Sequence, residues 1–280
     1  MKRLEPIVKN YEWGMEGVAH QYVDVGDKKV AELWWEGSSF LLKLLFVGKP
    51  LSLQVHPSQP QLHQYAFPDP HPKPEIVIAL QDGFHALCGF KETKHHLLTH
   101  HKFQSLFSLD QQSVKELLEG VEEYAEGHAG EEEECRIFLE LRRAHGDDPT
   151  VLAPFYMNHV CLKKGEALII PATQAHCYLS GLGMECMPPS DNVVRCGLTR
   201  KECQRELFFE MCCPPQAPIL QTYPYDHEEL DGYFQIRRTP TSCPKGSIVL
   251  VLGVGAWRVE EDVMKVEECP NTWVVVPTMD

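Results

Sequence analysis

The sequence predicts a mainly β protein, a sandwich or barrel of short strands interrupted by one helical insertion. Two observations lead to this prediction. Most of the chain consists of short apolar runs separated by Gly and Pro turns, which is typical of strands. Between Lys91 and about Asp148 the pattern changes to the spacing of amphipathic helices. The sequence shows no internal repeat of fixed period and no low-complexity tract.

The expected elements follow from this change of pattern. Before the insertion, strands are expected at 29–35, 39–47, 51–57, 75–80 and 84–90. In the insertion, helices are expected at 108–124, where a serine suits a cap, and at 131–146, where an acidic run forms a solvated helix start. After it, strands are expected at 155–172, 176–181 and 192–199, a helix at 201–211, a Pro-rich connector at 212–225, and strands at 233–239, 247–253 and 272–277.

Composition limits the classes of function. The chain has 280 residues, 43% of them hydrophobic and 24% charged, which is the profile of a soluble globular protein of one large or two small domains. A net charge of −14 argues against a nucleic-acid partner. No apolar run has the length of a signal peptide or a membrane span, so no membrane partner is expected. The eleven cysteines show no C-x-x-C spacing, and we interpret them as reduced residues of a cytoplasmic protein.

Polar residues on apolar strands need a separate explanation. Gln54 and His56 are two apart in "LSLQVHP" and therefore share one strand face. Glu75 opens a strand after the Pro-rich loop "FPDPHPKPE", and His176 follows a proline turn and shares a face with Tyr178. A single histidine near a strand end is more often a hydrogen-bonded structural group, and Glu75 alone could be an exposed strand start. Together, two imidazoles, a carboxylate and an amide oxygen suit a four-ligand site for a divalent ion such as zinc.

A fourth stretch, "MECMPPSDNVVRCGLTRK", packs several charged groups around an apolar core strand. These groups are Glu185, Asp191, Arg195 and Lys201. Lys43 lies among leucines and could extend its ammonium group to the surface. Arg195 alone could pair with any carboxylate. Spacing by itself does not decide between these structural interpretations and a binding site.

Several blocks of the sequence resemble the signature blocks of one family. "GKPLSLQVHP", "KPE", "LKKGEALIIPATQAHCYLSG" and "ECMPPSDNVVRCGLTRK" are similar to those of type I mannose-6-phosphate isomerase, also called phosphomannose isomerase. "YEWG" and "AELW" are similar to its N-terminal blocks. The resemblance implies a cupin-type β-barrel or jelly-roll with two cupin-like halves, 1–90 and 149–280, and a short helical insertion, 91–148. It also implies a zinc-dependent aldose–ketose isomerase that interconverts mannose 6-phosphate and fructose 6-phosphate and feeds GDP-mannose biosynthesis.

The resemblance also assigns residues. It places the ligands of one zinc ion at Gln54, His56, Glu75 and His176, and the active-site arginine at Arg195. Further positions that line the family's pocket are Lys43, Ser52, Lys73, Glu185, Asp191 and Lys201. The expected partner is a small phosphosugar, and the expected state is a monomer.

Isomerisation moves a proton between C2 and C1 of the sugar through a cis-enediol, and this requires a base and a group that stabilises negative charge. The candidates for the base are a metal-bound water, Glu185 and Lys73. Arg195 suits an enediolate oxygen or the phosphate, and Lys43 and Lys201 suit the phosphate.

Two other functions stay open on the sequence alone. One is a different cupin metalloenzyme, for example an iron-dependent dioxygenase. The other is a sugar-phosphate sensor without turnover, which the short helical insertion would allow. The sequence also has His71 and Pro72 before Lys-Pro-Glu, where the family usually has Asn-His.

Overall fold

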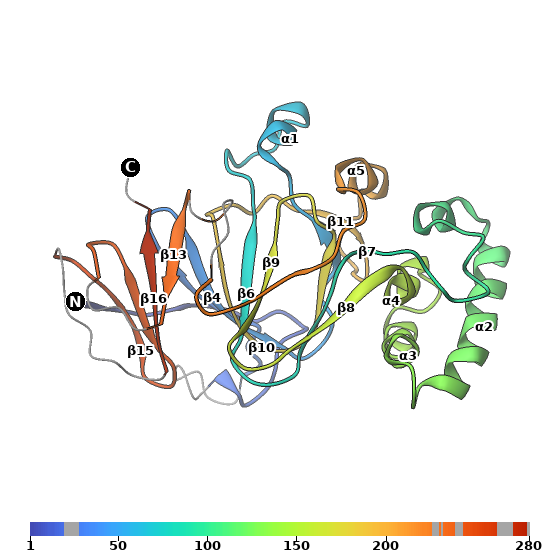
Figure 1. Cartoon of the computed structure of the whole chain (residues 1–280), viewed down its shortest axis with the longest axis horizontal. Helices are drawn as coiled ribbons and strands as arrows, with labels where there is room; N and C mark the ends of the chain where they lie inside the picture. Colours follow the sequence, from blue (N-terminus) through green and yellow to red (C-terminus); the bar gives the residue numbers. More distant parts are fainter. Residues whose placement is uncertain (20–27, 226–229, 231, 239–242, 262–270, 279–280) are drawn as a thin grey trace.

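The structure, a computed structural model, describes residues 1–19, 28–225, 230, 232–238, 243–261 and 271–278. A small sheet, a central group of strands and a set of helices follow one another along the longest axis of the molecule (Figure 1). The protein is mainly β, as the sequence predicts. Among the described residues, no helix combines the length and the apolar character needed to cross a membrane.

The first half of the chain runs from short strands into the helical segment. Its elements are β1 (Lys2–Leu4), β2 (Ile7–Lys9), β3 (Glu32–Glu36), β4 (Leu41–Val47), β5 (Leu53–Val55), α1 (Gln59–Gln64), β6 (Glu75–Ala79), β7 (Phe84–Phe90), the 3-10 helix η2 (Phe103–Ser108), α2 (Gln111–His128) and α3 (Glu133–His145). The remaining elements are the 3-10 helix η3 (Pro149–Leu152), α4 (Ala153–Tyr156), β8 (Met157–Leu162), β9 (Glu166–Ile170), β10 (His176–Met187), β11 (Val194–Gly197), α5 (Arg205–Met211), β12 (Ile219–Thr222), β13 (Phe234–Arg237), β14 (Ile248–Val251), β15 (Gly255–Arg258) and β16 (Thr272–Pro277).

The central strands form an antiparallel barrel whose two walls share β10. One wall has the order β12-β9-β6-β10-β4-β3-β2, and the other joins β8, β7, β10, β5 and β11. A separate sheet has the order β1-β15-β14-β16-β13, so it pairs the first strand of the chain with strands from its last part. Figure 1 shows this small sheet on the left and the barrel strands at the centre.

Strand β10 passes from one wall to the other between Ser180 and Gly181. Ser180 pairs with His85 of β7, whereas Gly181 pairs with Val47 of β4. The register to β7 shifts by one residue between Tyr178 and Ser180, which is a β-bulge. Gly181 has φ +123°, and a Cβ atom there would lie 2.7 Å from the Cα of Phe84. The bend therefore requires glycine.

Side-chain alternation gives the barrel an interior and an outer face. In β4, Leu44 and Phe46 pack outward against the small sheet, while Lys43, Leu45 and Val47 alternate with them and point into the barrel. One end of the interior is filled by Val77, Ala79, Phe84, Ala86, Leu168, Ile170 and Tyr178. The small sheet covers the outer face, where Phe40 and Phe234 meet edge to face with ring centroids 6.0 Å apart.

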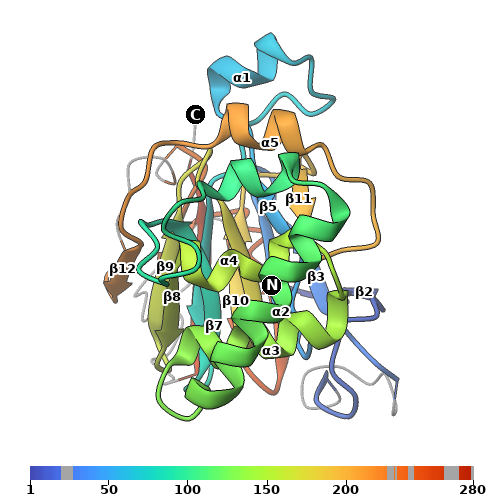
Figure 2. The same ribbon diagram turned by 90° about the vertical axis from the view of Figure 1, so that its right-hand side faces the viewer.

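The helical segment covers the other wall of the barrel. Leu118, Val121 and Phe138 of α2 and α3 share a buried cluster with Leu53 of β5 and Cys177 of β10. Figure 2 shows α2, α3 and α4 in front of the strands of this wall. A helix stacked on a sheet in this way buries the outer face of β5 and β10.

The structure confirms most of the expected elements and corrects others. The helix cap is Asp110, whose carboxylate accepts from the backbone N–H of Ser113 at 2.9 Å, and not a serine. The stretch 155–172 begins in a short helix and then forms two strands. The connector 212–225 contains strand β12. Strand β10 extends six residues beyond 181, because the glycines that suggest a turn lie at the bend between the walls. Strands β1, β2 and β15 and helix α1 were not predicted, because they are short and carry no long periodic pattern.

Gly181→Ala should lower the free energy of unfolding by about 2–5 kcal/mol. Alanine is strained at the φ of this position, and its methyl group would clash with the backbone of Phe84. Denaturant unfolding of purified protein measures this loss. Gly127→Ala in α2 is the matched control, since no atom beyond its chain neighbours and the backbone of its own helix lies within 4 Å of its Cβ position. The control should be neutral or slightly stabilising. Equal stability of the Gly181→Ala protein and the wild type would contradict the account of the bend.

Candidate metal centre

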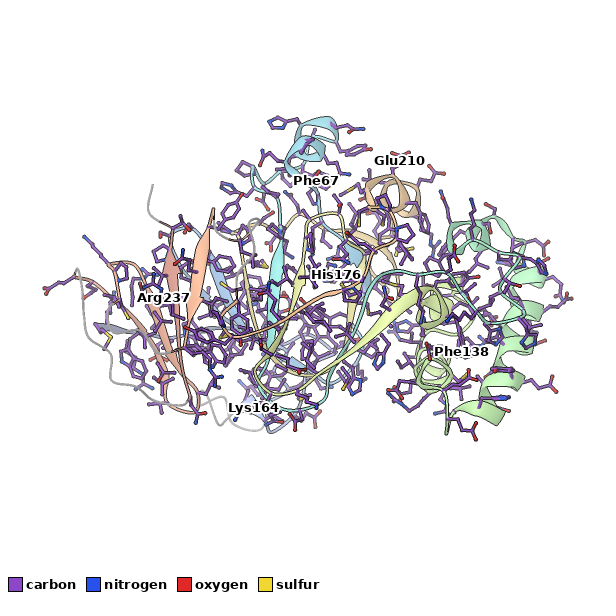
Figure 3. All side chains as sticks on the ribbon, in the orientation of Figure 1. Phe67, Phe138, Lys164, His176, Glu210 and Arg237 are labelled. Carbon is purple, nitrogen blue, oxygen red and sulfur yellow. The ribbon has the colours of Figure 1, made fainter. Side chains whose placement is uncertain are left out.

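Four side chains, from β5, β6 and β10 and from the residue that follows β5, converge in the interior of the barrel. His56 Nε2 lies 3.2 Å from Glu75 Oε1, and His176 Nε2 lies 3.3 Å from Glu75 Oε2. Gln54 pairs with His176 across β5 and β10, and its Nε2 lies 3.3 Å from His176 Nε2. His56, Glu75 and His176 are each at most 1% exposed. Figure 3 places His176 in the middle of the molecule, between the small sheet with Arg237 and the helices with Phe138.

Two backbone carbonyls set the tautomers of the two histidines. His56 Nδ1 lies 2.8 Å from the carbonyl oxygen of Asn192, and His176 Nδ1 lies 2.9 Å from that of Gln174. A carbonyl oxygen only accepts, so each Nδ1 carries the proton and donates it. In the neutral form of either ring, Nε2 would then present a lone pair toward Glu75.

This arrangement fits a bound cation. The Nε2 atoms of the two imidazoles face the two carboxylate oxygens of Glu75 at 3.2 and 3.3 Å. His56 Nε2 is buried and makes no hydrogen bond within the described part of the chain. A tetrahedral zinc ion with bonds of about 2.0–2.1 Å holds its ligand atoms about 3.3 Å apart, which matches the spacing in this cluster. The donor set also suits zinc, because imidazole and carboxylate are its common ligands.

A half turn of its amide would let Gln54 complete this set. In the structure Ser52 Oγ donates to Gln54 Oε1 at 3.0 Å, and the amide nitrogen faces His176. The two ends of an amide are assigned from their hydrogen bonds, and a half turn exchanges them. After that turn the oxygen would face the cluster, and the amide would donate to Ser52, whose hydroxyl also accepts.

Burial and charge keep His56 and Glu75 in the protonation states that a metal needs. Burial, followed by the charge of Lys73, lowers the pKa of His56 to about 3. Burial by itself would raise the pKa of Glu75, but the ammonium group of Lys73, whose Nζ lies 3.0 Å from Glu75 Oε1, holds that pKa well below its ordinary value. The imidazole is therefore neutral and the carboxylate ionised, which are the forms that bind metals.

A second layer of charged groups extends from the cluster into the barrel. Tyr178 Oη lies 3.1 Å from Glu75 Oε2 and 3.0 Å from Glu185 Oε1, and Lys43 Nζ donates to Glu185 Oε2 at 2.8 Å. Burial and the charge of Glu75 raise the pKa of Glu185. Burial opposes the charge on Lys43, but Glu185 and other carboxylates outweigh it and raise the pKa of this ammonium.

The bulge in β10 is what brings Glu185 to this layer. Strict alternation from His176 and Tyr178 would place residue 185 on the opposite face. The extra residue at the bulge reverses the alternation, so Glu185 points inward, opposite Lys43 of β4. Sequence reasoning noted that His176 and Tyr178 share a face but missed that Tyr178 bridges the two glutamates.

The remaining predicted residues are more exposed than the histidines and the glutamate of the cluster. Arg195 of β11 pairs with Gln54 and is half-buried, and no hydrogen bond or ion pair to another described residue engages its guanidinium group. Asp191 and Lys201 are exposed. The Lys201 ammonium lies 5.4 Å from the ring centroid of Tyr11. Burial, then the charge of Glu32, raises the pKa of Tyr11, and Asp191 adds to this shift.

Asn192 is a further site residue that the sequence did not reveal. Its carbonyl sets the tautomer of His56, and its side chain holds the loop before Lys73. Asn192 Nδ2 donates to the carbonyl of Asp69 at 2.9 Å, and Asn192 Oδ1 accepts from the Asp69 N–H at 3.2 Å. These contacts join two segments more than 120 positions apart, so local sequence carries no signal for them.

The chain is similar in sequence to known phosphomannose isomerases. Residues 18–93 match the family model "Phosphomannose isomerase type I, catalytic domain". Mannose-6-phosphate isomerase 2 of Arabidopsis thaliana is 30% identical over 284 residues, which cover 80% of this chain and 64% of that protein. Mannose-6-phosphate isomerase of Homo sapiens is 32% identical over 62% of this chain and 51% of its own length. The resemblance to type I phosphomannose isomerases is confirmed. The chain spans between 51% and 64% of the length of these two relatives.

Solved structures confirm the fold. A phosphomannose isomerase variant from Salmonella typhimurium has a TM-score of 0.77 at 20% identity, covering 99% of this chain and 94% of that chain. A mannose 6-phosphate isomerase bound with zinc and yttrium has a TM-score of 0.75 at 20% identity, with the same coverage of both chains. The cupin-like barrel that the sequence resemblance implies is therefore the fold of this protein.

Lys43→Met should lower the free energy of unfolding by about 3–5 kcal/mol, because it leaves the buried carboxylate of Glu185 without its counter-charge. The double variant Lys43→Met, Glu185→Met should recover much of the loss in denaturant unfolding. Lys115→Met is the control: its pair with Glu119 is more than half exposed and should contribute less than about 0.5 kcal/mol. An equal decrease in the free energy of unfolding for Lys43→Met and Lys115→Met would show that the buried Lys43–Glu185 pair contributes no more than an exposed one.

Proposed function

We propose that this protein is a zinc-dependent aldose–ketose isomerase that interconverts mannose 6-phosphate and fructose 6-phosphate. The observation that carries the proposal is the pair of carbonyl-oriented imidazoles that face Glu75, next to a guanidinium group without a partner among the described residues. The names of the matched relatives and the zinc-bound structural neighbour support the reaction and the metal.

We infer that Gln54, His56, Glu75 and His176 hold one zinc ion. Bound there, the ion supplies a positive charge that polarises the sugar oxygens as a Lewis acid. Two imidazoles, an amide and one carboxylate leave part of the charge of the ion uncompensated, as this chemistry requires. The carbonyls of Asn192 and Gln174 support the ligands by fixing their tautomers.

The anionic part of the substrate would be held by the more exposed of the predicted cations. Arg195 lies beside Gln54, so its fork of donors suits an oxygen of the reacting carbons. Lys201, beside Tyr11, suits the phosphate, and Asp191 also acts on Tyr11. Ser52 contacts Gln54 and is a polar neighbour of the ligands. Lys43 is committed to Glu185 inside the barrel, which favours a role for it as a buried counter-charge. Lys201 would thus bind one end of the phosphosugar and Arg195 the other.

We assign the proton transfer between C2 and C1 to one of two buried groups, Lys73 or Glu185. Both lie next to the cluster and are less than a tenth exposed. Glu185 has a raised pKa, which makes its carboxylate a stronger base than an exposed one. Tyr178 would keep Glu185 oriented through its hydroxyl.

We also infer how the chain is divided. Residues 1–90 and 149–280 would form the catalytic core, with 91–148 as an inserted helical cover, because the ligands come from both flanking parts. The ten cysteines that the structure describes are free, which supports a reducing, cytoplasmic location.

Purified protein should convert mannose 6-phosphate to fructose 6-phosphate, lose this activity after chelation and regain it with added zinc. A coupled assay of fructose 6-phosphate measures the three states. Activity that survives complete metal removal would contradict the zinc assignment. Zinc-loaded, folded protein that binds the substrate without turnover would overturn the isomerase proposal and favour a sugar-phosphate sensor.

Arg195→Ala and His176→Ala should separate substrate stabilisation from metal binding. Arg195→Ala should keep the zinc at this centre and lose about a hundredfold or more in kcat, the scale of losing one charge-stabilising donor. His176→Ala should lose the zinc of this centre as well as activity. Metal analysis and steady-state kinetics on both variants test this. Equal loss of zinc in the two would show that Arg195 has a structural role.

A further inference from the structure

A second group of metal-binding side chains lies on the outer face of the barrel, away from the pocket. His85 of β7 and His159 of β8 are diagonal neighbours, since His85 pairs with Cys161 and His159 pairs with Leu87. Glu133, the first residue of α3, approaches both of them from the helical segment. Figure 2 shows α3 passing beside β7 and β8. Three elements thus contribute one ligating side chain each.

The distances within this group suit a transition metal. His85 Nδ1 lies 3.0 Å from His159 Nε2, and Glu133 Oε1 lies 3.9 Å and 4.0 Å from these two nitrogens. A triangle with these edges has a circumradius of about 2.1 Å, so one point in the plane of the three atoms lies at a zinc–nitrogen or zinc–oxygen bond length from all of them. Tetrahedral coordination, with ligand atoms about 3.3 Å apart and a fourth position outside that plane, would require Glu133 Oε1 to move roughly 0.6 Å closer to the two nitrogens. The side chains are 24%, 16% and 39% exposed for His85, His159 and Glu133, which leaves the position open to entry from solvent.

Neighbouring groups hold the ligands in place. Cys161 Sγ lies 3.7 Å from His85 Nε2, so the sulfur can accept the proton of this nitrogen and leave Nδ1 as the free ligand atom. Arg136 grips the carboxylate of Glu133, with Nε donating to Oε2 at 2.8 Å and Nη2 donating to Oε1. A carboxylate oxygen has two lone pairs, so Oε1 can serve both Arg136 and a metal.

Without a metal, the same residues form a simple hydrogen-bonded group. One imidazole would donate to the other, and Glu133 would be an ordinary surface partner of Arg136. That interpretation accounts for the contact of 3.0 Å between the ring nitrogens. It gives no reason for the carboxylate to lie almost equally far from the two facing nitrogens. A shared cation gives that reason.

We propose that His85, His159 and Glu133 form a second site for a divalent transition metal, which fastens the helical segment to the β7–β8 hairpin. Two imidazoles and one carboxylate favour zinc or cobalt over magnesium and calcium, which prefer oxygen ligands. A fourth position would remain for water. Because the three ligands come from α3, β7 and β8, the ion would cross-link the insertion to the barrel and stabilise it by binding only the folded arrangement.

Cobalt titration of chelator-treated, full-length protein tests the proposal, with the visible absorption of bound Co²⁺ and metal analysis as readouts. The wild type should bind two equivalents. His159→Gln should lose one equivalent and keep isomerase activity, and His176→Ala should lose the other equivalent and the activity. His96→Gln is the control, because His96 stacks on His95 as His85 does on His159 and is exposed. It should bind two equivalents.

Unchanged stoichiometry in His159→Gln, or a single equivalent in the wild type that His176→Ala removes, would overturn the second site. Hydrogen exchange gives an independent reading. Co²⁺ added to the His176→Ala protein should slow exchange in α3 and β8, and the further change His159→Gln should abolish the effect. Protection of neither element would also overturn the proposal. A wild-type protein that binds two equivalents of cobalt but shows no isomerase activity would contradict only the isomerase assignment.

Discussion

Two glutamates and two lysines are buried together at one end of the barrel interior, and the structure around them depends on their mutual compensation. Glu75, Glu185, Lys43 and Lys73 are each less than a tenth exposed. A single charged side chain buried there without a partner would lose its hydration at a cost on the order of several kcal/mol. The direct pairs Lys43–Glu185 and Lys73–Glu75, joined through Tyr178, offset this cost. The barrel can therefore hold charged side chains away from water, and charges in such an environment act more strongly on a bound molecule.

One strand, β10, determines both the barrel and the site. Its first half pairs with β5 and β7 and its second half with β4 and β6, so it belongs to both walls. At the bulge before Gly181, β10 passes from one wall to the other, and the side of the strand that faces the barrel interior is reversed. His176 and Tyr178 precede the bulge and Glu185 comes after it, yet all three reach the same interior. A straight strand would put Glu185 among the apolar side chains outside the barrel.

The sequence could predict the features that arise from local pattern. Gln54 and His56 share a face by alternation, and the family blocks assign Glu75 and His176 to the same site, where the structure indeed brings them together. It could not predict the features that depend on distant backbone. The carbonyl that orients His56 comes from a loop 136 positions away, and the bulge that turns Glu185 inward appears only as one extra residue in a strand. Strands β12 and β15 were missed because β12 lies within a Pro-rich stretch and β15 begins in a Gly-rich turn, and neither contains an apolar run.

The small sheet buries the apolar outer face of the barrel wall. Strands that carry charged ligands inward must hide apolar residues on their outer face, as Leu44 of β4 and Ile76 of β6 do. Water on that face would weaken the strands that position Lys43 and Glu75. The sheet of β13, β14, β15 and β16, completed by β1, covers it with Phe234 and Ile248. A part of the chain that contributes none of the proposed ligands thus supports the centre by keeping the wall behind it dry.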